Sequence, residues 1–151
     1  MTTTVLGLGN LILADEGIGV RALQRLVEDP RVPSDVELVD GGTLGLELLS
    51  LAAGSERLIV LDAVDHGAAP GTLVRLTGDE LGGLPGGGTV HQLGLVDLLS
   101  ALRLMGQEPA DIVLLGIQPG RIGLGTELTE DVRDALDQLV EAAVRECREG
   151  I

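Results

Sequence analysis

The chain opens with TTVLGLGN at residues 3–10, a short apolar run that leads into a glycine-rich turn. The run Thr3–Leu8 predicts a buried strand that ends in the glycine loop Gly7–Asn10. The next segment, Gly17–Val27, carries apolar residues at helical spacing, and Pro30 and Pro33 follow it. The start of the chain therefore predicts a strand, a loop and a helix in that order.

The same alternation continues to the end of the sequence. Further strands are predicted at Val36–Val39, Arg57–Leu61, Thr72–Leu76 and Ile112–Ile117, and further helices at Leu44–Ala52, at Leu93–Met105 and from just after Thr129. The segment near residue 72 alternates in polarity, as a strand at a sheet edge would. This order predicts a single α/β domain over residues 1–151, with a mostly parallel sheet and helices on both faces.

The composition narrows the classes of partner. Asp and Glu number 24 against 10 Lys and Arg, which gives a formal net charge of −14. Such a polyanion repels phosphate backbones and anionic lipids, so we expect no nucleic-acid and no membrane-surface partner. The 151 residues include no Phe, Tyr or Trp, which leaves no aromatic platform for bases and no aromatic cage for a cation.

Two further features concern location and redox state. The first residues lack a basic start followed by an apolar run, and no stretch approaches about 18 uncharged apolar residues. We therefore expect a cytoplasmic protein. Its single cysteine, Cys147, cannot form an internal disulfide and is predicted to be a half-exposed helical residue.

Polar residues cluster where the predicted strands end. Parallel α/β sheets bind their ligands beyond the carboxyl ends of the strands. The clusters at these ends are Asp15–Glu16, Asp40, Asp62–Asp65, and Gln118 with Arg121. His91 precedes a predicted helix, in a loop that could join them.

The glycine-rich turn does not fit a dinucleotide site. Its third glycine would fall at position 12, which is Ile12. Asp15 and Glu16 stand where a phosphate-binding loop presents a bare helix N-terminus. Because two carboxylates would repel a pyrophosphate, the sequence favours a cation or a neutral peptide.

The acidic residues have structural as well as functional interpretations. Acids in a first helical turn stabilise the helix dipole by about 0.3–1 kcal/mol each, which would explain Asp15 or Glu16 alone. Asp62 directly follows the apolar run Leu58–Leu61, so it either caps the next turn or belongs to a site. From the residues alone both alternatives stay open.

Two carboxylates and an imidazole would suit a divalent ion such as nickel or zinc, with positions left for water or substrate. Glu16, Asp62 and one of the two histidines, His66 or His91, could supply them. The alternative for each histidine is a solvated side chain or a turn partner, which is the commoner state of a lone loop histidine.

The motifs of the chain closely resemble those of the hydrogenase maturation endopeptidases, which process the large subunit of nickel–iron hydrogenases. The first motif is GLGNLILADEGIGV at residues 7–20. Others follow in the order of that family: Asp40–Thr43, Val60–Asp65, Pro70–Thr72, His91–Leu95 and Gly116–Pro119. The resemblance covers nearly the whole chain.

This resemblance implies a three-layer αβα sandwich around a twisted sheet. It also implies a metal site formed by Glu16, Asp62 and His91, and a role for Asp40 in cleavage or substrate handling. His66 lies where relatives commonly carry a bulky apolar residue, so it is assigned no ligand role.

The activity implied by the resemblance is removal of a short C-terminal extension from a hydrogenase large-subunit precursor after nickel has been inserted. Nickel is expected to arrive with the precursor, while zinc or cadmium could bind the same ligands adventitiously. The expected catalytic residues are Asp40, Glu16 and Asp62, with the carboxylates acting as ligands, as general base or as both. The free protein is expected to be a monomer.

Two alternatives use the same residues or a similar opening motif. A nickel-sensing chaperone would bind the loaded subunit without cutting it. A peptidyl-tRNA hydrolase would share the opening Gly-Leu-Gly-Asn, but the chain has no His-Asn pair and is strongly acidic, so this alternative ranks well behind.

Overall fold

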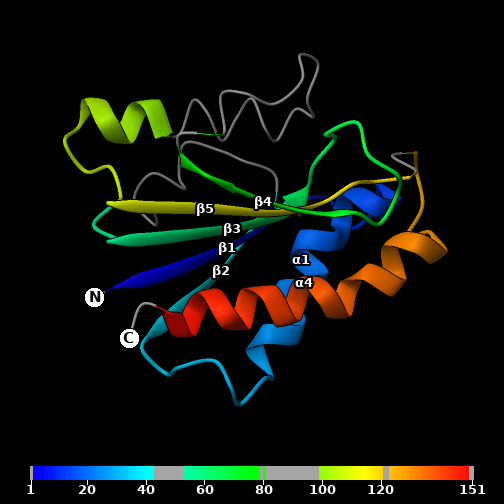
Figure 1. Cartoon of the computed structure of the whole chain (residues 1–151), viewed down its shortest axis with the longest axis horizontal. Coiled ribbons are helices and arrows are strands. Elements are labelled where there is room, and N and C mark those ends of the chain that lie inside the picture. Colours follow the sequence, from blue (N-terminus) through cyan, green and yellow to red (C-terminus); the bar gives the residue numbers. More distant parts are fainter. Residues whose placement is uncertain (1, 43–52, 79, 81–98, 121–122, 150–151) are drawn as a thin grey trace.

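A sheet with the strand order β2-β1-β3-β5-β4 forms the centre of the molecule (Figure 1). The computed structural model describes residues 2–42, 53–78, 80, 99–120 and 123–149. The strands are β1 (Thr3–Leu8), β2 (Val36–Gly42), β3 (Arg57–Ala63), β4 (Leu73–Thr77) and β5 (Asp111–Ile117). Among the strand pairs of the described residues, β4 with β5 is the one antiparallel pair, and β4 lies at the edge of the sheet. The predicted mostly parallel sheet is confirmed, including the edge position of the strand near residue 72.

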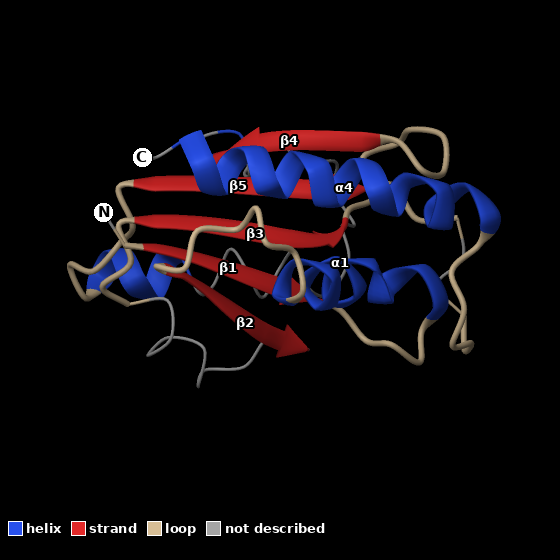
Figure 2. Cartoon of the chain, turned by 90° about the horizontal axis from the view of Figure 1, so that it is seen from below, coloured by secondary structure: helices blue, strands red, loops and turns tan. Residues whose placement is uncertain are grey.

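Helices cover both faces of this sheet. α1 (Ile18–Val27) and α4 (Glu130–Glu149) contact each other on one face (Figure 2), and the short 3-10 helix η1 (Ala14–Gly17) leads directly into α1. Residues 99–104 are helical and lie on the opposite face. The αβα sandwich is thus confirmed. The helix predicted at 44–52 lies outside the described residues, and none of the described helices has the length and apolar character needed to cross a bilayer.

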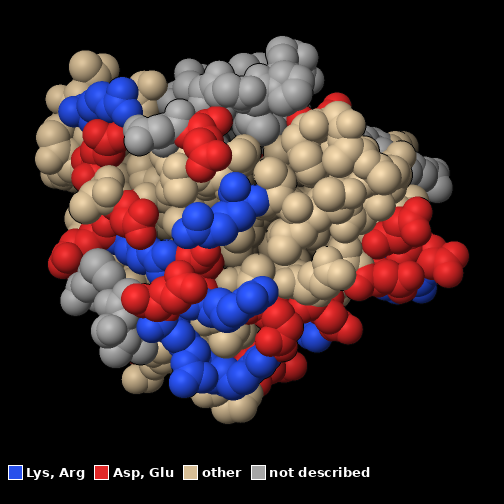
Figure 3. Space-filling model, in the orientation of Figure 1, with Lys and Arg blue, Asp and Glu red and all other residues tan. Residues whose placement is uncertain are grey.

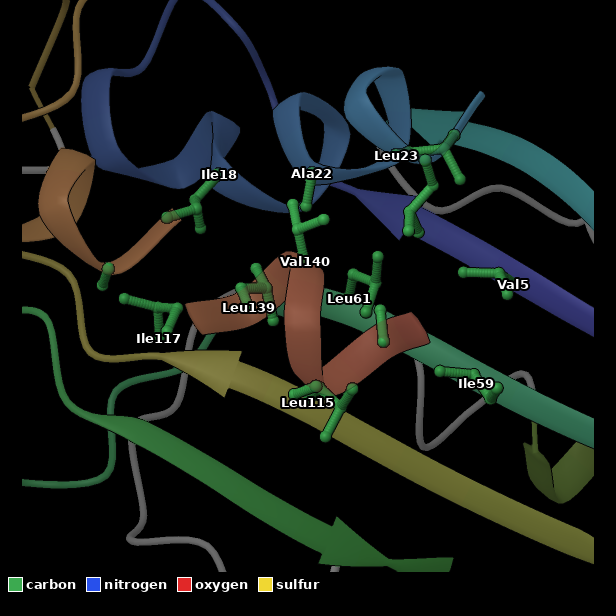
Figure 4. Packing of buried hydrophobic residues seen from close by; sticks show 14 of the residues in the cluster. Val5, Ile18, Ala22, Leu23, Ile59, Leu61, Leu115, Ile117, Leu139 and Val140 are labelled. Carbon is green, nitrogen blue, oxygen red and sulfur yellow. The ribbon is translucent and has the colours of Figure 1, made fainter. Parts of the chain in front are cut away.

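Side chains of the central strands are buried on both faces because they alternate along each strand. In β3, Ile59 and Leu61 pack toward α1 and α4 (Figure 4). Leu58 and Val60 point to the other face, where they join the apolar side chains of the helical segment 99–104. Parallel strands that are covered on both faces have nearly continuous apolar sequences. This is why the apolar run Leu58–Leu61 could be recognised as a buried strand.

An ion-pair network centred on the buried side chains of Arg57 and Glu146 lies at the amino-terminal end of the sheet. The Arg57 guanidinium donates to the Asp111 carboxylate at 2.7 Å and to both the side chain and the backbone carbonyl of Glu146. Glu146 also accepts a hydrogen bond from Arg75. Burial works to lower the pKa of Arg57, but the bonds to the two carboxylates outweigh it and the pKa is raised. The network ties α4 to the first residues of β3 and β5.

Two expectations about single positions are corrected. Cys147 was expected to be half-exposed, but it is buried in the core between α4 and the sheet. Burial raises the pKa of its thiol to about 11, so the side chain behaves as a small apolar group. The strands also extend further than predicted: β2 includes Asp40, and β3 includes Asp62.

Candidate functional site

The loop after β1 turns back sharply at Gly9. This residue has a φ of 132°, and a Cβ there would lie 1.9 Å from the carbonyl oxygen of Glu16. Only glycine fits such a close approach of two backbone segments. The first motif therefore folds so that η1, which carries Glu16, packs directly onto the end of β1.

A second glycine places η1 next to β3. Gly19, in the first turn of α1, packs so closely on the sheet that a Cβ would lie 2.4 Å from the Leu8 oxygen and 2.1 Å from the Leu61 oxygen. η1 itself contacts β3. Glu16 is thereby held at the carboxyl end of β1 and β3, beside the strand that carries Asp62.

Glu16 and Asp62, at the carboxyl end of the sheet, are nearly inaccessible to solvent. Glu16 is 6% exposed and Asp62 is 2% exposed. Asp62 continues the row formed by Leu58 and Val60, on the sheet face opposite α1 and α4, and its Oδ1 accepts a hydrogen bond from the Ala63 amide at 2.8 Å. Burial of a carboxylate is costly unless charged or polar partners compensate it. Two buried carboxylates at the ligand-binding edge of a parallel sheet are thus suited to binding a cation.

Asp15 has a different role from its neighbour. Its carboxylate accepts hydrogen bonds from the Gly120 amide at 2.7 Å, the Thr129 amide at 2.7 Å and the Thr129 hydroxyl at 2.8 Å. The dipole of the following helix does not explain this arrangement. Asp15 instead fixes η1 to the segment that precedes α4. Sequence analysis missed this link because the partners are more than 100 residues away and no pattern connects them.

Asp40 lies on β2, at the other side of β1. It pairs with Gly7 of β1, and Gly7 pairs with Leu61 of β3 on its other side. Because adjacent strands are about 4.8 Å apart, the backbones of Asp40 and β3 are separated by about 10 Å. The Asp40 residue is exposed, in contrast to Glu16 and Asp62. Asp40 therefore lies at the same end of the sheet as Asp62, two strands away from it.

The loop after β3 is held by Gln118. The buried Gln118 side chain accepts hydrogen bonds from the amides of His66 at 2.8 Å and Ala68 at 3.3 Å, and it donates to the Asp65 carboxylate at 3.2 Å. The His66 ring contacts the Val64 carbonyl oxygen through Nδ1 at 3.0 Å. Of the predicted polar clusters, Asp65 and Gln118 are thus in direct contact.

His91 and Arg121 lie outside the described residues. Within the part that is described, no three side chains of the metal-binding types come together as a ligand set. The triad of Glu16, Asp62 and His91 stays a prediction.

The comparisons with known proteins agree with one another. A family model described as hydrogenase maturation protease matches residues 20–146. The chain is 42% identical over 147 residues to the hydrogenase expression/formation protein HupD of Rhodobacter capsulatus, covering 95% of this chain and 70% of HupD. It is also 42% identical over 152 residues to the Hydrogenase 2 maturation protease of Escherichia coli, covering 97% of this chain and 92% of the relative.

Solved structures give the same answer. The hydrogenase maturating endopeptidase HybD from E. coli superposes with a TM-score of 0.92 at 38% identity, over 99% of this chain and 94% of the other. The [NiFe] hydrogenase maturation protease HybD from Thermococcus kodakarensis superposes with a TM-score of 0.82 at 27% identity, over 98% of this chain and 100% of the other. The chain therefore belongs to the hydrogenase maturation protease family.

Proposed function

We propose that this endopeptidase removes the C-terminal extension of a [NiFe]-hydrogenase large-subunit precursor that already carries nickel. The observation that carries the proposal is the pair of buried carboxylates, Glu16 and Asp62, held at the carboxyl end of β1 and β3 in a member of this family. Nickel belongs to the substrate here, and it would arrive bound to the precursor. An empty precursor would then lack the positive charge that these carboxylates bind.

In the proposed mechanism Glu16 and Asp62, with His91, bind the precursor's nickel and so bring the scissile peptide bond to the edge of the sheet. Peptide hydrolysis adds the oxygen of water to the carbonyl carbon, and the released amine takes up a proton. A carboxylate that accepts the proton of the attacking water supplies the base, and a nearby cation polarises the carbonyl. The buried setting strengthens both effects, because the effective dielectric is low.

Asp40 is proposed to handle the substrate peptide. Asp40 is exposed and lies about 10 Å across the sheet from β3, which supports a contact with the peptide on one side of the bond. Glu37 offers a matched control, because it is an exposed carboxylate on the same strand. Asp40→Asn is expected to slow cleavage, whereas Glu37→Gln is expected to leave it unchanged.

The direct test is incubation of the purified protein with nickel-loaded and nickel-free precursor, followed by intact mass. The expected result is loss of a C-terminal peptide from the loaded form alone. Glu16→Gln, Asp62→Asn and His91→Ala are each expected to lower the rate by about 10²–10⁴-fold. Wild-type rates in all three variants would contradict the proposed site, and binding without any loss of mass would favour a non-cleaving nickel-sensing chaperone.

A further inference from the structure

Exposed apolar side chains gather in the loops next to Glu16. Leu11 and Ile12 come just before η1, and Leu124 lies in the segment that leads to α4. Ile12 is 55% exposed and Leu124 is 74% exposed. Exposed leucines and isoleucines are ordinary when they are scattered singly, but a group beside a proposed site indicates a contact surface.

Backbone pairing brings together the two segments that carry Ile12 and Leu124. The Gly125 amide donates to the Ile12 oxygen at 2.9 Å, and the Gly125 oxygen accepts from the Ala14 amide at 2.8 Å. These bonds form a parallel bridge between Leu13 and Gly125. The bridge holds the two segments side by side, with Ile12 and Leu124 each directly preceding one of its two residues.

The segments that carry Ile12 and Leu124 are held in a fixed backbone conformation in which both side chains are exposed. Ala14 has a φ of 50°, in the left-handed region that alanine rarely occupies. Its amide bond to Gly125 and the three hydrogen bonds of Asp15 maintain this conformation. Backbone strain of this kind is concentrated at binding sites. The apolar pair is therefore presented on a fixed frame.

The charge distribution at the carboxyl end of the sheet favours an uncharged ligand. Figure 3 shows a broad uncharged area over the loops at the carboxyl end of the sheet, bordered by acidic side chains at the start of α4. This contrasts with the net charge of −14 for the whole chain. A segment that binds across this area gains affinity from apolar burial, while flanking basic groups would meet the acidic border.

We propose that Ile12 and Leu124, with Leu11 beside them, form a docking surface for an apolar segment of the large-subunit precursor, close to the bond that is cut. This inference rests on the proposed function. Ile12 lies four residues before Glu16 in the same hydrogen-bonded loop, so a chain bound on this surface is continuous with the proposed site. The docking surface selects the precursor by its sequence, whereas the carboxylates select it by its nickel.

The test compares the double variant Ile12→Gln/Leu124→Gln with Leu104→Gln. Leu104 is an 89% exposed leucine at the end of the helical segment 99–104, outside the proposed docking surface. The measurements are kcat and KM for nickel-loaded precursor and, separately, binding of that precursor to the immobilised protein. We expect the double variant to raise KM and the dissociation constant at least about tenfold, with kcat and the unfolding midpoint unchanged. Leu104→Gln should match the wild type in every measurement.

Each outcome separates docking from cleavage. If the wild type binds the precursor without cutting it, and the double variant loses this binding, the docking surface stands while the proposed activity fails. If the wild type cuts and the double variant has wild-type KM and affinity, the docking surface is overturned and the activity stands. The wild type is also tested for self-association by sedimentation and for binding to phosphatidylcholine vesicles. If the double variant loses either of these properties while its affinity for the precursor is unchanged, the surface has another occupant. That result would also overturn the proposal.

Discussion

Asp15 and Glu16 are adjacent acids in η1, yet the structure gives them separate surroundings. Asp15 accepts three hydrogen bonds from the segment before α4, so its charge is used within the fold. Charge-assisted hydrogen bonds are about twice as strong as neutral ones. Asp15 thus acts as a positioning residue for its neighbour, because any shift of η1 moves Glu16 as well.

Asp15→Asn tests this positioning role, because it replaces one carboxylate oxygen with an NH₂ group. The substituted amide keeps one acceptor oxygen but places an NH₂ group against an N–H donor, either at Gly120 or at Thr129. We expect the free energy of unfolding to fall by about 2 kcal/mol, the range for hydrogen bonds to a charged group, and kcat for the precursor to fall. Urea unfolding followed by circular dichroism measures the first effect.

Thr129→Ser provides the control for Asp15→Asn. Serine keeps both the amide and the hydroxyl that donate to Asp15, so its stability should stay within about 0.5 kcal/mol of the wild type. Equal stability of Asp15→Asn and the wild type would show that the three hydrogen bonds do not hold η1 in solution.

At the scale of elements, the contact between α1 and the sheet depends on a missing side chain. Gly19 lets the first turn of α1 approach the backbone oxygens of Leu8 and Leu61. Helix propensity alone favours alanine over glycine by about 1 kcal/mol. The close approach opposes this preference, because both neighbouring atoms belong to the backbone of buried strands and cannot rotate away.

Gly19→Ala is therefore expected to destabilise the protein. The added methyl group would force α1 and η1 away from β1 and β3, at a cost of at least about 2 kcal/mol. Gly78→Ala is the matched control, since its Cβ would meet only the Ile112 side chain at an ordinary 3.6 Å. Thermal unfolding of both variants distinguishes the two effects, and a Gly19→Ala protein as stable as the wild type would contradict the packing.

The elements themselves could be predicted well from sequence. β1 has the predicted bounds Thr3–Leu8, and α4 begins at Glu130, just after Thr129. These segments are readable because burial on both faces leaves continuous apolar runs in strands and a periodic apolar face in helices. The ends of β2 and β3 were placed too early, because a polar residue can continue a strand by backbone pairing alone.

The site could be predicted only in part. Glu16 and Asp62 were recognised because they follow apolar runs and belong to motifs, and both lie at the predicted edge of the sheet. The hydrogen bonds of Asp15 to Gly120 and Thr129, and the pairing of Leu13 with Gly125, connect distant segments. Such contacts depend on tertiary packing, and neither spacing nor composition contains them.

At the scale of the whole molecule, the two ends of the sheet serve different purposes. The amino-terminal end carries the ion-pair network centred on Arg57 and Glu146, whose charges neutralise each other. The carboxyl end carries the buried carboxylates Glu16 and Asp62, within a chain of net charge −14. Surplus negative charge attracts a cation to this end, but it also makes the folded chain repel itself.

This self-repulsion predicts that salt stabilises the protein. Raising NaCl from about 10 to about 150 mM shortens the screening length from about 30 to about 8 Å and weakens repulsion across the molecule. Exposed ion pairs such as Arg25–Asp137 weaken too, but each contributes only about 0–1 kcal/mol. Because acids outnumber bases by 14, the loss of repulsion should dominate, and the free energy of unfolding should rise.

Urea unfolding at the two NaCl concentrations measures this effect, because urea adds no ions of its own. The matched variant is Asp35→Asn/Glu37→Gln, which removes two exposed acids and changes the net charge from −14 to −12, since −14 + 2 = −12. Its stability should rise less with salt than that of the wild type. A decrease in stability with salt would instead mean that surface ion pairs such as Arg25–Asp137, between α1 and α4, outweigh the repulsion.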